Sequence, residues 1–181
     1  MKATGIVRRI DDLGRIVIPK EIRRTLRIRE ADPLEIFTDR EGEIILKKYS
    51  PIGEMSTFAR QYAESLAQVS GHAVLISDRD QFIAAAGGCK QLLGKEISRE
   101  LGEKIENREN LMASRSDKGF IRVVQEGMED VVQEAIWPII CEGDVIGAVM
   151  LVSSDAKASM GDVEQKLIQS AASFLGRQME Q

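Results

Sequence analysis

The feature that most constrains the fold is the run IVIPKEIRRTL at residues 16–26, where a strand-forming segment meets a helix-forming one at a proline. Ile16, Val17 and Ile18 are β-branched and favour an extended strand. Pro19 cannot donate a ladder hydrogen bond but suits the first turn of a helix. We therefore expect a strand followed directly by a short helix.

Two hairpins are predicted in this part of the chain. Residues 4–10 are a run of mixed β-formers, and residues 11–14 supply a turn in which the glycine can adopt a positive φ. Residues 34–37 and 44–47 alternate in polarity around a turn at residues 39–42. The first hairpin should use the strand before Pro19, and the second should follow the helix.

The charge of this segment is opposite to that of the whole protein, whose net charge is −4. Residues 1–50 hold 12 basic and 9 acidic side chains, whereas the remaining residues hold 13 basic and 20 acidic ones. Residues 5–27 alone carry seven basic side chains: Arg8, Arg9, Arg15, Lys20, Arg23, Arg24 and Arg27. Charge segregated in this way indicates an anionic partner for the amino-terminal part and excludes nucleic acid for the rest.

The stretches MKATGIVRRIDDLGRIVIPKEIRRTL and PLEIFTDREGEIILKKY closely resemble the AbrB-type transition-state regulators. The resemblance implies a swapped-hairpin β-barrel that is formed by two chains and binds double-stranded DNA. In that family DNA contacts are attributed to arginines at the places of Arg8, Arg15, Arg23 and Arg24, and Arg9 stands where a lysine is also usual. These five residues are the predicted DNA-binding site.

The size of the amino-terminal segment predicts a dimer. About 50 residues without a disulfide or a metal are near the lower limit for independent folding, so two copies should pool their apolar faces into one core. A two-fold axis would then place two sets of arginines on one surface. The sequence YSPIGE at residues 49–54 breaks the pattern, so we expect a DNA-binding domain at 1–50, a linker at 51–55 and a second domain at 56–181.

The second domain should be bounded by two amphipathic helices. Residues 55–70 carry an apolar stripe at helical spacing and are followed by Gly71, and residues 160–179 repeat the pattern. Each stripe can pack on its own domain or form a seam between subunits, and the spacing does not separate these alternatives. We expect at least partial use in assembly, which would join dimers into a homotetramer.

Strands are expected at 72–77, 81–86, 131–141 and 145–152, a charged helix at 95–107, a loop at 108–119 and an extended segment at 120–124. The overall class is therefore α+β, with an antiparallel sheet flanked by helices. The stretches AVLISDRDQFIAAAGG and PIICEGDVIGAVMLVSS are similar to small-molecule sensor domains of the GAF type. That resemblance implies a ligand cavity, whose ligand the residues do not identify, or a vestigial pocket in an oligomerisation platform.

The candidate chemistry of the second domain is sparse. Cys89 and Cys141 are far apart in sequence and favour reduced, packed thiols over a disulfide or zinc site. Glu129, Asp130 and Glu134 have no spacing typical of a metal or acid–base site, so a solvated face is expected. No cofactor, metal or catalytic residue is predicted.

The sequence predicts a DNA-binding transcriptional regulator. An antitoxin-like module that binds a protein is one alternative. A second is a GAF-type redox enzyme that uses Cys89 or Cys141, as methionine sulfoxide reductases of that type do. The amino terminus lacks an apolar signal region and no apolar stretch approaches about 18 residues, so a cytoplasmic protein without a membrane partner is expected.

Overall fold

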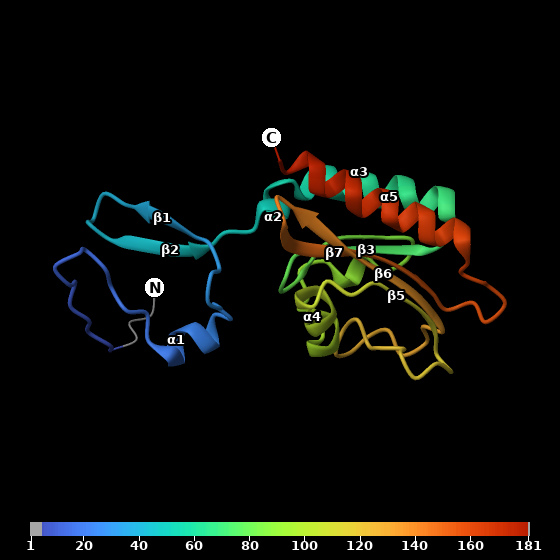
Figure 1. The fold of residues 1–181 in the computed structure, drawn as a ribbon, viewed down its shortest axis with the longest axis horizontal. Helices are drawn as coiled ribbons and strands as arrows, with labels where there is room; N and C mark the ends of the chain where they lie inside the picture. The colour runs from blue at the N-terminus through green and yellow to red at the C-terminus, as the bar shows by residue number, and fades with distance from the viewer. Residues whose placement is uncertain (1–4, 181) are drawn as a thin grey trace. The chain divides into compact units, whose positions relative to one another are not determined.

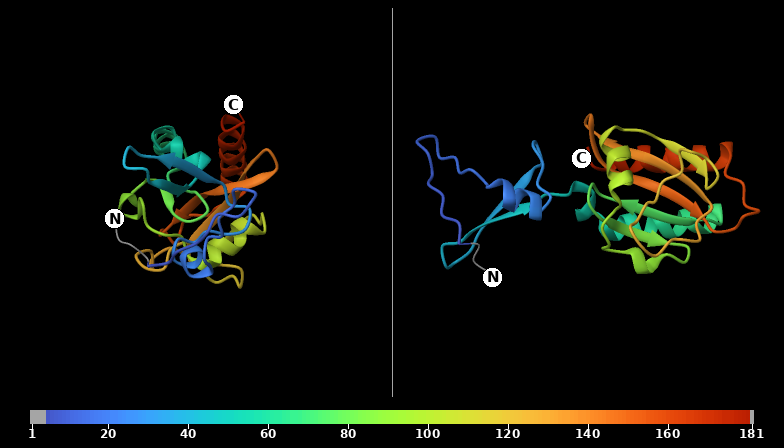
Figure 2. Two further views of the ribbon diagram at one scale, coloured as in Figure 1. Left: turned by 90° about the vertical axis from the view of Figure 1, so that its left-hand side faces the viewer. Right: turned by 90° about the horizontal axis from the view of Figure 1, so that it is seen from below.

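The computed structural model describes residues 5–180 and divides the chain into two compact units, Met1–Tyr49 and Ser50–Gln181 (Figure 1). Residues 5–49 of the first unit contain one helix and one two-stranded sheet. The second contains a five-stranded sheet with helices on both of its faces (Figure 2). No helix within residues 5–180 is long and apolar enough to cross a membrane.

The first unit is built from α1 (Lys20–Thr25), β1 (Leu34–Thr38) and β2 (Ile44–Lys48). Pro19 is the residue before α1, so the helix begins directly after this proline, where the sequence predicts it. The strands β1 and β2 pair antiparallel, and Asp39 closes the turn by accepting hydrogen bonds from the backbone N–H groups of Glu41 and Glu43. The second predicted hairpin is therefore confirmed.

The first predicted hairpin forms its turn but not its strands. Gly14 has a φ of +75°, and the N–H of Asp11 donates to the carbonyl of Arg15 at 3.0 Å. Residues 5–10 and 15–18 nevertheless pair with no strand within the described part of the chain, and Thr4 lies outside it. The apolar side chains of the segment are exposed, with Val7 at 85% and Val17 at 72%. A single chain offers these side chains no apolar surface to pack against, so the expected strands are absent from it.

The second unit contains an antiparallel sheet in the order β4-β3-β7-β6-β5. Its strands are β3 (Ala73–Ser77), β4 (Phe82–Ala86), β5 (Leu111–Ser114), β6 (Gln133–Cys141) and β7 (Asp144–Ser153). The predicted hairpin formed by β6 and β7 lies next to β3, so strands distant in sequence are neighbours in the sheet. The predicted antiparallel α+β class is confirmed.

Helices and loops cover both faces of this sheet. The helical segments are α2 (Pro51–Glu54), α3 (Ser56–Ser70), η1 (Lys90–Leu92), α4 (Arg99–Glu106) and α5 (Asp162–Gln178). The helices α3 and α5 lie side by side on one face (Figures 1 and 2), where Ala63, Leu66 and Ile168 belong to a buried core. On the other face α4, η1 and residues 119–131 enclose a second core that contains Leu101 and Ile136.

Two glycines allow close packing in the second unit. A Cβ atom added to Gly176 of α5 would lie 2.0 Å from the carbonyl oxygen of Ile140, and one added to Gly147 would lie 1.9 Å from that of Ser77. Real Cβ contacts do not reach such distances. The approach of α5 to β6 therefore requires a glycine at position 176.

Three further segments differ from the sequence expectation. Residues 51–54 of the expected linker form α2, which Ser50 caps by accepting the N–H of Gly53, and the Ile52 side chain is buried. The expected loop at 108–119 contains β5, because β6 offers it a free edge for pairing. The expected extended segment at 120–124 contributes only a bridge between Val124 and Ile97.

Candidate nucleic-acid interface

The turn at residues 11–15 is organised by the Asp11 carboxylate. Its Oδ1 atom accepts the backbone N–H groups of Leu13 at 3.0 Å and Arg15 at 2.8 Å. Its Oδ2 atom lies 2.9 Å from Nε of Arg15, whose side chain is 70% exposed. The Arg15 backbone N–H, the Arg15 side chain and the Leu13 N–H together lower the pKa of Asp11. The turn thus holds Arg15 at both backbone and side chain.

The helix α1 carries the adjacent residues Arg23 and Arg24, both exposed. The helix ends in paired hydrogen bonds, from the N–H of Ile28 to the carbonyl of Arg23 at 2.7 Å and from the N–H of Arg27 to that of Arg24 at 3.3 Å. Arg27 occupies the left-handed position, with a φ of +52°, which is more usual for glycine. The carbonyl groups of Arg23 and Arg24 at the end of α1 are therefore satisfied.

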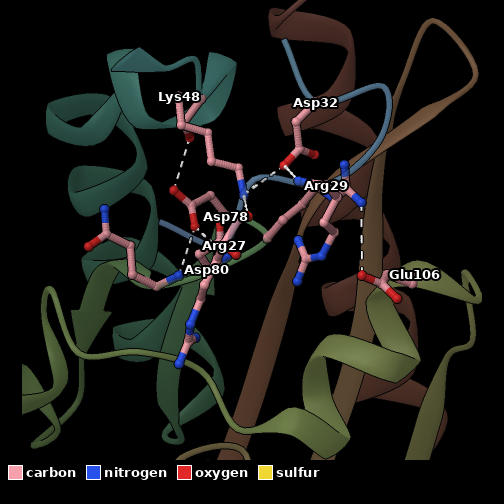
Figure 3. Close-up of polar contacts among 10 residues, drawn as sticks. Arg27, Arg29, Asp32, Lys48, Asp78, Asp80 and Glu106 are labelled. Carbon is pink, nitrogen blue, oxygen red and sulfur yellow. Dashed lines mark hydrogen bonds and ion pairs between the residues drawn. The ribbon is translucent and has the colours of Figure 1, made fainter. Parts of the chain in front are cut away.

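An ion pair fixes the chain between α1 and β1 (Figure 3). The Nζ atom of Lys48 lies 3.0 Å from Oδ2 of Asp32 and donates to the carbonyl of Arg27 at 2.8 Å. The same Asp32 oxygen accepts the N–H of Arg29 at 2.8 Å. Lys48 therefore ties the end of β2 to the residues that follow α1, which fixes the helix that carries Arg23 and Arg24.

All five predicted DNA-binding residues are exposed in the structure. Arg23 and Arg24 are neighbours on α1, Arg15 is held by Asp11, and Arg8 and Arg9 lie in the extended stretch before the turn. Among residues 5–180, Arg15 is the one member of the five that makes an ion pair. Exposed guanidinium groups present planar donor sets that fit phosphate oxygens or guanine edges.

The two cysteines lie in environments that oppose thiolate chemistry. Cys89 is 2% exposed, and its thiol donates to the carbonyl of Ala86 at 3.0 Å. Burial raises the pKa of Cys89, and burial together with the charges of Glu142, Glu180 and Asp144 raises the pKa of Cys141. Because the thiolate is the reactive form of cysteine, a raised pKa leaves less of it near neutral pH.

The structure also contains one acidic residue that the sequence analysis misplaced. Glu129 and Asp130 are exposed, as expected for a solvated face, but the Glu134 side chain is only 1% exposed. Glu134 stands between Gln133 and Ala135 in a strand covered on both faces, and no local sequence signal indicates its burial. Glu134 lies beside a cavity in the second unit.

Comparisons with known families assign a class to both units. Residues 54–180 match a family described as "Stage V sporulation protein T C-terminal, transcription factor". Residues 7–54 match a family described as "Antidote-toxin recognition MazE, bacterial antitoxin". The fold and these matches define a transcription factor with an AbrB-like amino-terminal domain.

The chain belongs to the stage V sporulation protein T family. It is similar to stage V sporulation protein T of Bacillus subtilis (strain 168), with 55% identity over 182 aligned positions that cover 100% of both chains. It is 45% identical over 107 residues to the transition state regulatory protein AbrB of the same organism, which covers 59% of this chain and 92% of that protein. The resemblances expected from the sequence are confirmed.

Solved structures identify the fold of the second unit. The GAF domain of the nutrient sensor CodY from Clostridium difficile has a TM-score of 0.52 at 16% identity, covering 66% of this chain and 83% of that one. The GAF domain of an Acinetobacter phosphoenolpyruvate-protein phosphotransferase has a TM-score of 0.55 at 11% identity, covering 71% and 87%. A free methionine-R-sulfoxide reductase from Thermoplasma acidophilum has a TM-score of 0.53 at 14% identity, covering 69% and 94%. These likenesses show the GAF fold alone.

Proposed function

We propose that the amino-terminal unit binds double-stranded DNA through Arg8, Arg9, Arg15, Arg23 and Arg24. The observation that carries this proposal is their exposure on a basic unit of a transcription factor. The affinity would come mainly from phosphate contacts and would fall steeply with salt. Bidentate contacts with guanine would add some base readout.

We further propose that two chains complete this unit as a swapped-hairpin barrel. The segment that carries three of the arginines also exposes the apolar side chains of Val7, Ile10, Leu13 and Val17. A second copy of the segment would cover these side chains and would supply the strand pairing that one chain lacks. The two-fold axis that relates the two chains would repeat the arginines along a duplex.

The helices α3 and α5 are the proposed surface for joining two dimers into a tetramer. The rings of Phe58, Tyr62 and Phe174 form a cluster, with centroids 5.8 Å apart for Phe58 and Phe174 and 5.4 Å apart for Tyr62 and Phe174. Phe174 is still 40% exposed beside these partners. A partly covered aromatic cluster is typical of an association surface.

We infer that the protein is cytoplasmic and regulates genes of late sporulation as an activator and a repressor. The second unit is proposed to modulate DNA binding in response to a small molecule, for which its GAF fold is the support. No enzymatic activity is proposed, since the raised pKa values of Cys89 and Cys141 oppose the redox alternative. Failure of the purified protein to reduce methionine sulfoxide would agree with this assignment, and turnover would contradict it.

The antitoxin-family match of residues 7–54 supports a second candidate, an amino-terminal module that binds a protein. Antitoxins of that type usually end in a disordered tail, whereas this chain continues into a folded unit. The DNA-binding candidate is therefore favoured. A DNA-binding assay with the intact protein separates the two.

The test measures affinity for duplex DNA against salt for the intact protein and for Arg23→Ala and Arg24→Ala. Each variant should bind more weakly and should flatten the slope of log affinity against log salt by about 0.9 for each phosphate group that it no longer neutralises. The matched control is Arg40→Ala, which removes an exposed arginine outside the five and should leave the slope unchanged. Equal slopes for all the proteins would contradict the proposed interface.

A further inference from the structure

Glu134 lies in the interior of the sheet of the second unit. It belongs to β6 and pairs with Ala113 of β5 on one side and Val152 of β7 on the other. Apolar groups surround it, because Ile136 and Val152 belong to the core on the α4 face of the sheet. Acidic side chains are rarely buried in such surroundings unless another group pairs with them.

The Glu134 carboxyl group is only half satisfied. Its Oε1 atom accepts the backbone N–H of Ile121 at 2.8 Å. Its Oε2 atom is buried and has no hydrogen-bond partner among residues 5–180. Buried polar atoms nearly always have a partner, so an orphaned carboxylate oxygen indicates a role beyond packing.

A cavity of about 70 Å³ adjoins this carboxyl group. Its walls include the apolar residues Phe120, Ile121, Met128 and Val131, and its polar members are Arg115, Arg122, Gln125, Glu126, Glu129 and Glu134. A cavity of about 150 Å³ holds a molecule of benzene, so this one accommodates roughly three non-hydrogen atoms. The space therefore fits the head group of a ligand.

The charged groups around the cavity leave Glu134 without a counter-ion. Arg115, Arg122, Glu126 and Glu129 line it, and Glu100 approaches from α4. The Nη1 atom of Arg115 donates to the carbonyl of Glu129 at 2.5 Å and to that of Val131 at 3.4 Å. Glu100 accepts the backbone N–H of Arg122 at 2.9 Å. No ion pair joins any cation of the described chain to Glu134.

We propose that this cavity binds the ammonium group of a small primary amine, with Oε2 of Glu134 as its acceptor. The inference rests on the ligand-sensing role proposed for the second unit and gives its ligand a chemical class. An ammonium group brings a positive charge and N–H donors, one of which would satisfy the unpartnered Oε2 atom of Glu134. The Glu134 carboxylate would repel an anion placed at Oε2, and a divalent metal there would require more oxygen ligands than Glu134 offers.

A second cavity of about 270 Å³ lies next to the first, because Gly127 and Met128 line both. Its other lining residues include His72, Ser153 and Ser154. Together the two cavities reach the lower end of the range of ligand pockets, roughly 300 Å³. A larger amine would place its ammonium group at Glu134 and its polar remainder beside these serines.

The backbone amide of Ile121 provides a reporter for the test, since its N–H donates directly to Glu134. Burial raises the pKa of Glu134 to about 7, and the charge of Glu100 adds to the effect while the Ile121 hydrogen bond opposes it. The amide proton shift of Ile121 should therefore titrate near neutral pH in the intact protein. Methylammonium chloride is the probe, with a dissociation constant expected in the millimolar range.

Methylammonium at about tenfold its dissociation constant, as measured near pH 8, should lower the midpoint of the Ile121 titration by about one pH unit, because the cation binds only the ionised carboxylate. Sodium and tetramethylammonium chloride at equal ionic strength should leave the midpoint unchanged. In Glu134→Gln the titration and the methylammonium response should both disappear. Glu126→Gln, which removes an equal charge from the same cavity wall, should retain both.

A midpoint that methylammonium does not move, or moves no more than sodium does, would overturn the proposal and leave water or the carboxyl proton as the partner of Oε2. An equal response in Glu134→Gln would also overturn it. The titration contains no DNA, so its failure is distinct from failure of the proposed DNA interface, which the salt dependence of the arginine variants tests separately.

Discussion

The Asp11 carboxylate holds Arg15 through both of its oxygen atoms. Oδ1 accepts the backbone N–H of Arg15 at 2.8 Å, and Oδ2 lies 2.9 Å from Nε of the Arg15 side chain. One bond shapes the turn before the proposed DNA-binding helix. The other places a carboxylate where a phosphate group would otherwise bind the guanidinium group. Asp11 is thus both a support for Arg15 and a competitor for it.

Separating these two effects gives the first prediction. Asp11→Asn keeps the Oδ1 acceptor, and with it the turn, but removes the charge that pairs with Arg15. DNA affinity at low salt should rise severalfold, and the salt slope should steepen by up to about 0.9 as Arg15 becomes free to bind a phosphate group. Asp11→Ala removes the turn bonds as well and should weaken binding. Fluorescence anisotropy with a labelled duplex measures both quantities.

Asp12→Asn is the matched control, because it removes an equal charge from the neighbouring exposed residue, which forms no ion pair with Arg15 in the described chain. It should raise affinity only slightly and leave the slope unchanged. The same gain in both asparagine variants would show that net charge, and not release of Arg15, governs binding.

The second prediction concerns assembly. Val17→Glu introduces charge into the apolar side chains that a second chain is proposed to cover, so the protein should no longer dimerise through its amino-terminal unit and should bind DNA much more weakly. Phe174→Ser should reduce a tetramer to dimers while DNA binding by each dimer persists. Sedimentation velocity reports both changes.

Leu93→Glu is the control for assembly, since Leu93 is 53% exposed but lies outside both proposed surfaces. Its sedimentation should match that of the unaltered protein. A Val17→Glu protein that sediments unchanged and still binds DNA would contradict the swapped-hairpin proposal.

The third prediction concerns stability and pH. The pKa of Glu134 is about 7 in the folded protein and near 4.5 in the unfolded chain. Between these values the folded protein binds more protons than the unfolded one, so the free energy of unfolding falls as pH rises. Across this pH window Glu134 lowers the free energy of unfolding by up to about 3 kcal/mol. Urea unfolding at about pH 4.5 and pH 8 should therefore show that the free energy of unfolding falls more between these pH values for the unaltered protein than for Glu134→Gln. Equal losses would mean that Glu134 is not a buried acid.

The fourth prediction concerns the contact between α5 and β6. Gly176→Ala would bring a Cβ atom to 2.0 Å from the carbonyl oxygen of Ile140, so the helix must move. The overpacking should cost about 1–3 kcal/mol, of which the better helix propensity of alanine recovers up to about 1. Chemical unfolding should show a net loss of stability.

Gly102→Ala makes the same substitution in α4, where the new Cβ atom would lie 3.7 Å from Cδ1 of Ile97 in ordinary contact. This variant should gain up to about 1 kcal/mol from helix propensity. A gain in both variants would contradict the close approach at Gly176.

Elements with strong local signals were predictable from the sequence. The helix α3 begins and ends close to its expected bounds because an apolar stripe leads to Gly71, whose φ of +72° closes the helix. The hairpin of β6 and β7 follows from apolar runs around the turn at Glu142 and Gly143. In these cases the residues that determine the structure are neighbours in sequence.

The missed features depend on distant partners. The strand β5 has only four residues, and its pairing with β6 decides its structure. The strands expected around Gly14 require apolar cover that one chain does not supply. Burial of Glu134 follows from coverage of β6 by residues 119–131, which no local pattern encodes. The five arginines remain a predicted DNA-binding site, and the prediction rests on the resemblance of their identities and spacing to a known family, not on positions in space.

The contact between Phe58 and Phe174 has a mechanical consequence for the second unit. Phe58 lies near the beginning of the unit and Phe174 near its end, so the contact between their rings holds the two ends of the unit together. A stretching force applied between the two ends would act on the contact between Phe58 and Phe174 before it acted on the sheet. A short peptide could also bridge the ends, so the unit is suited to circular permutation, with new termini opened in a distant loop.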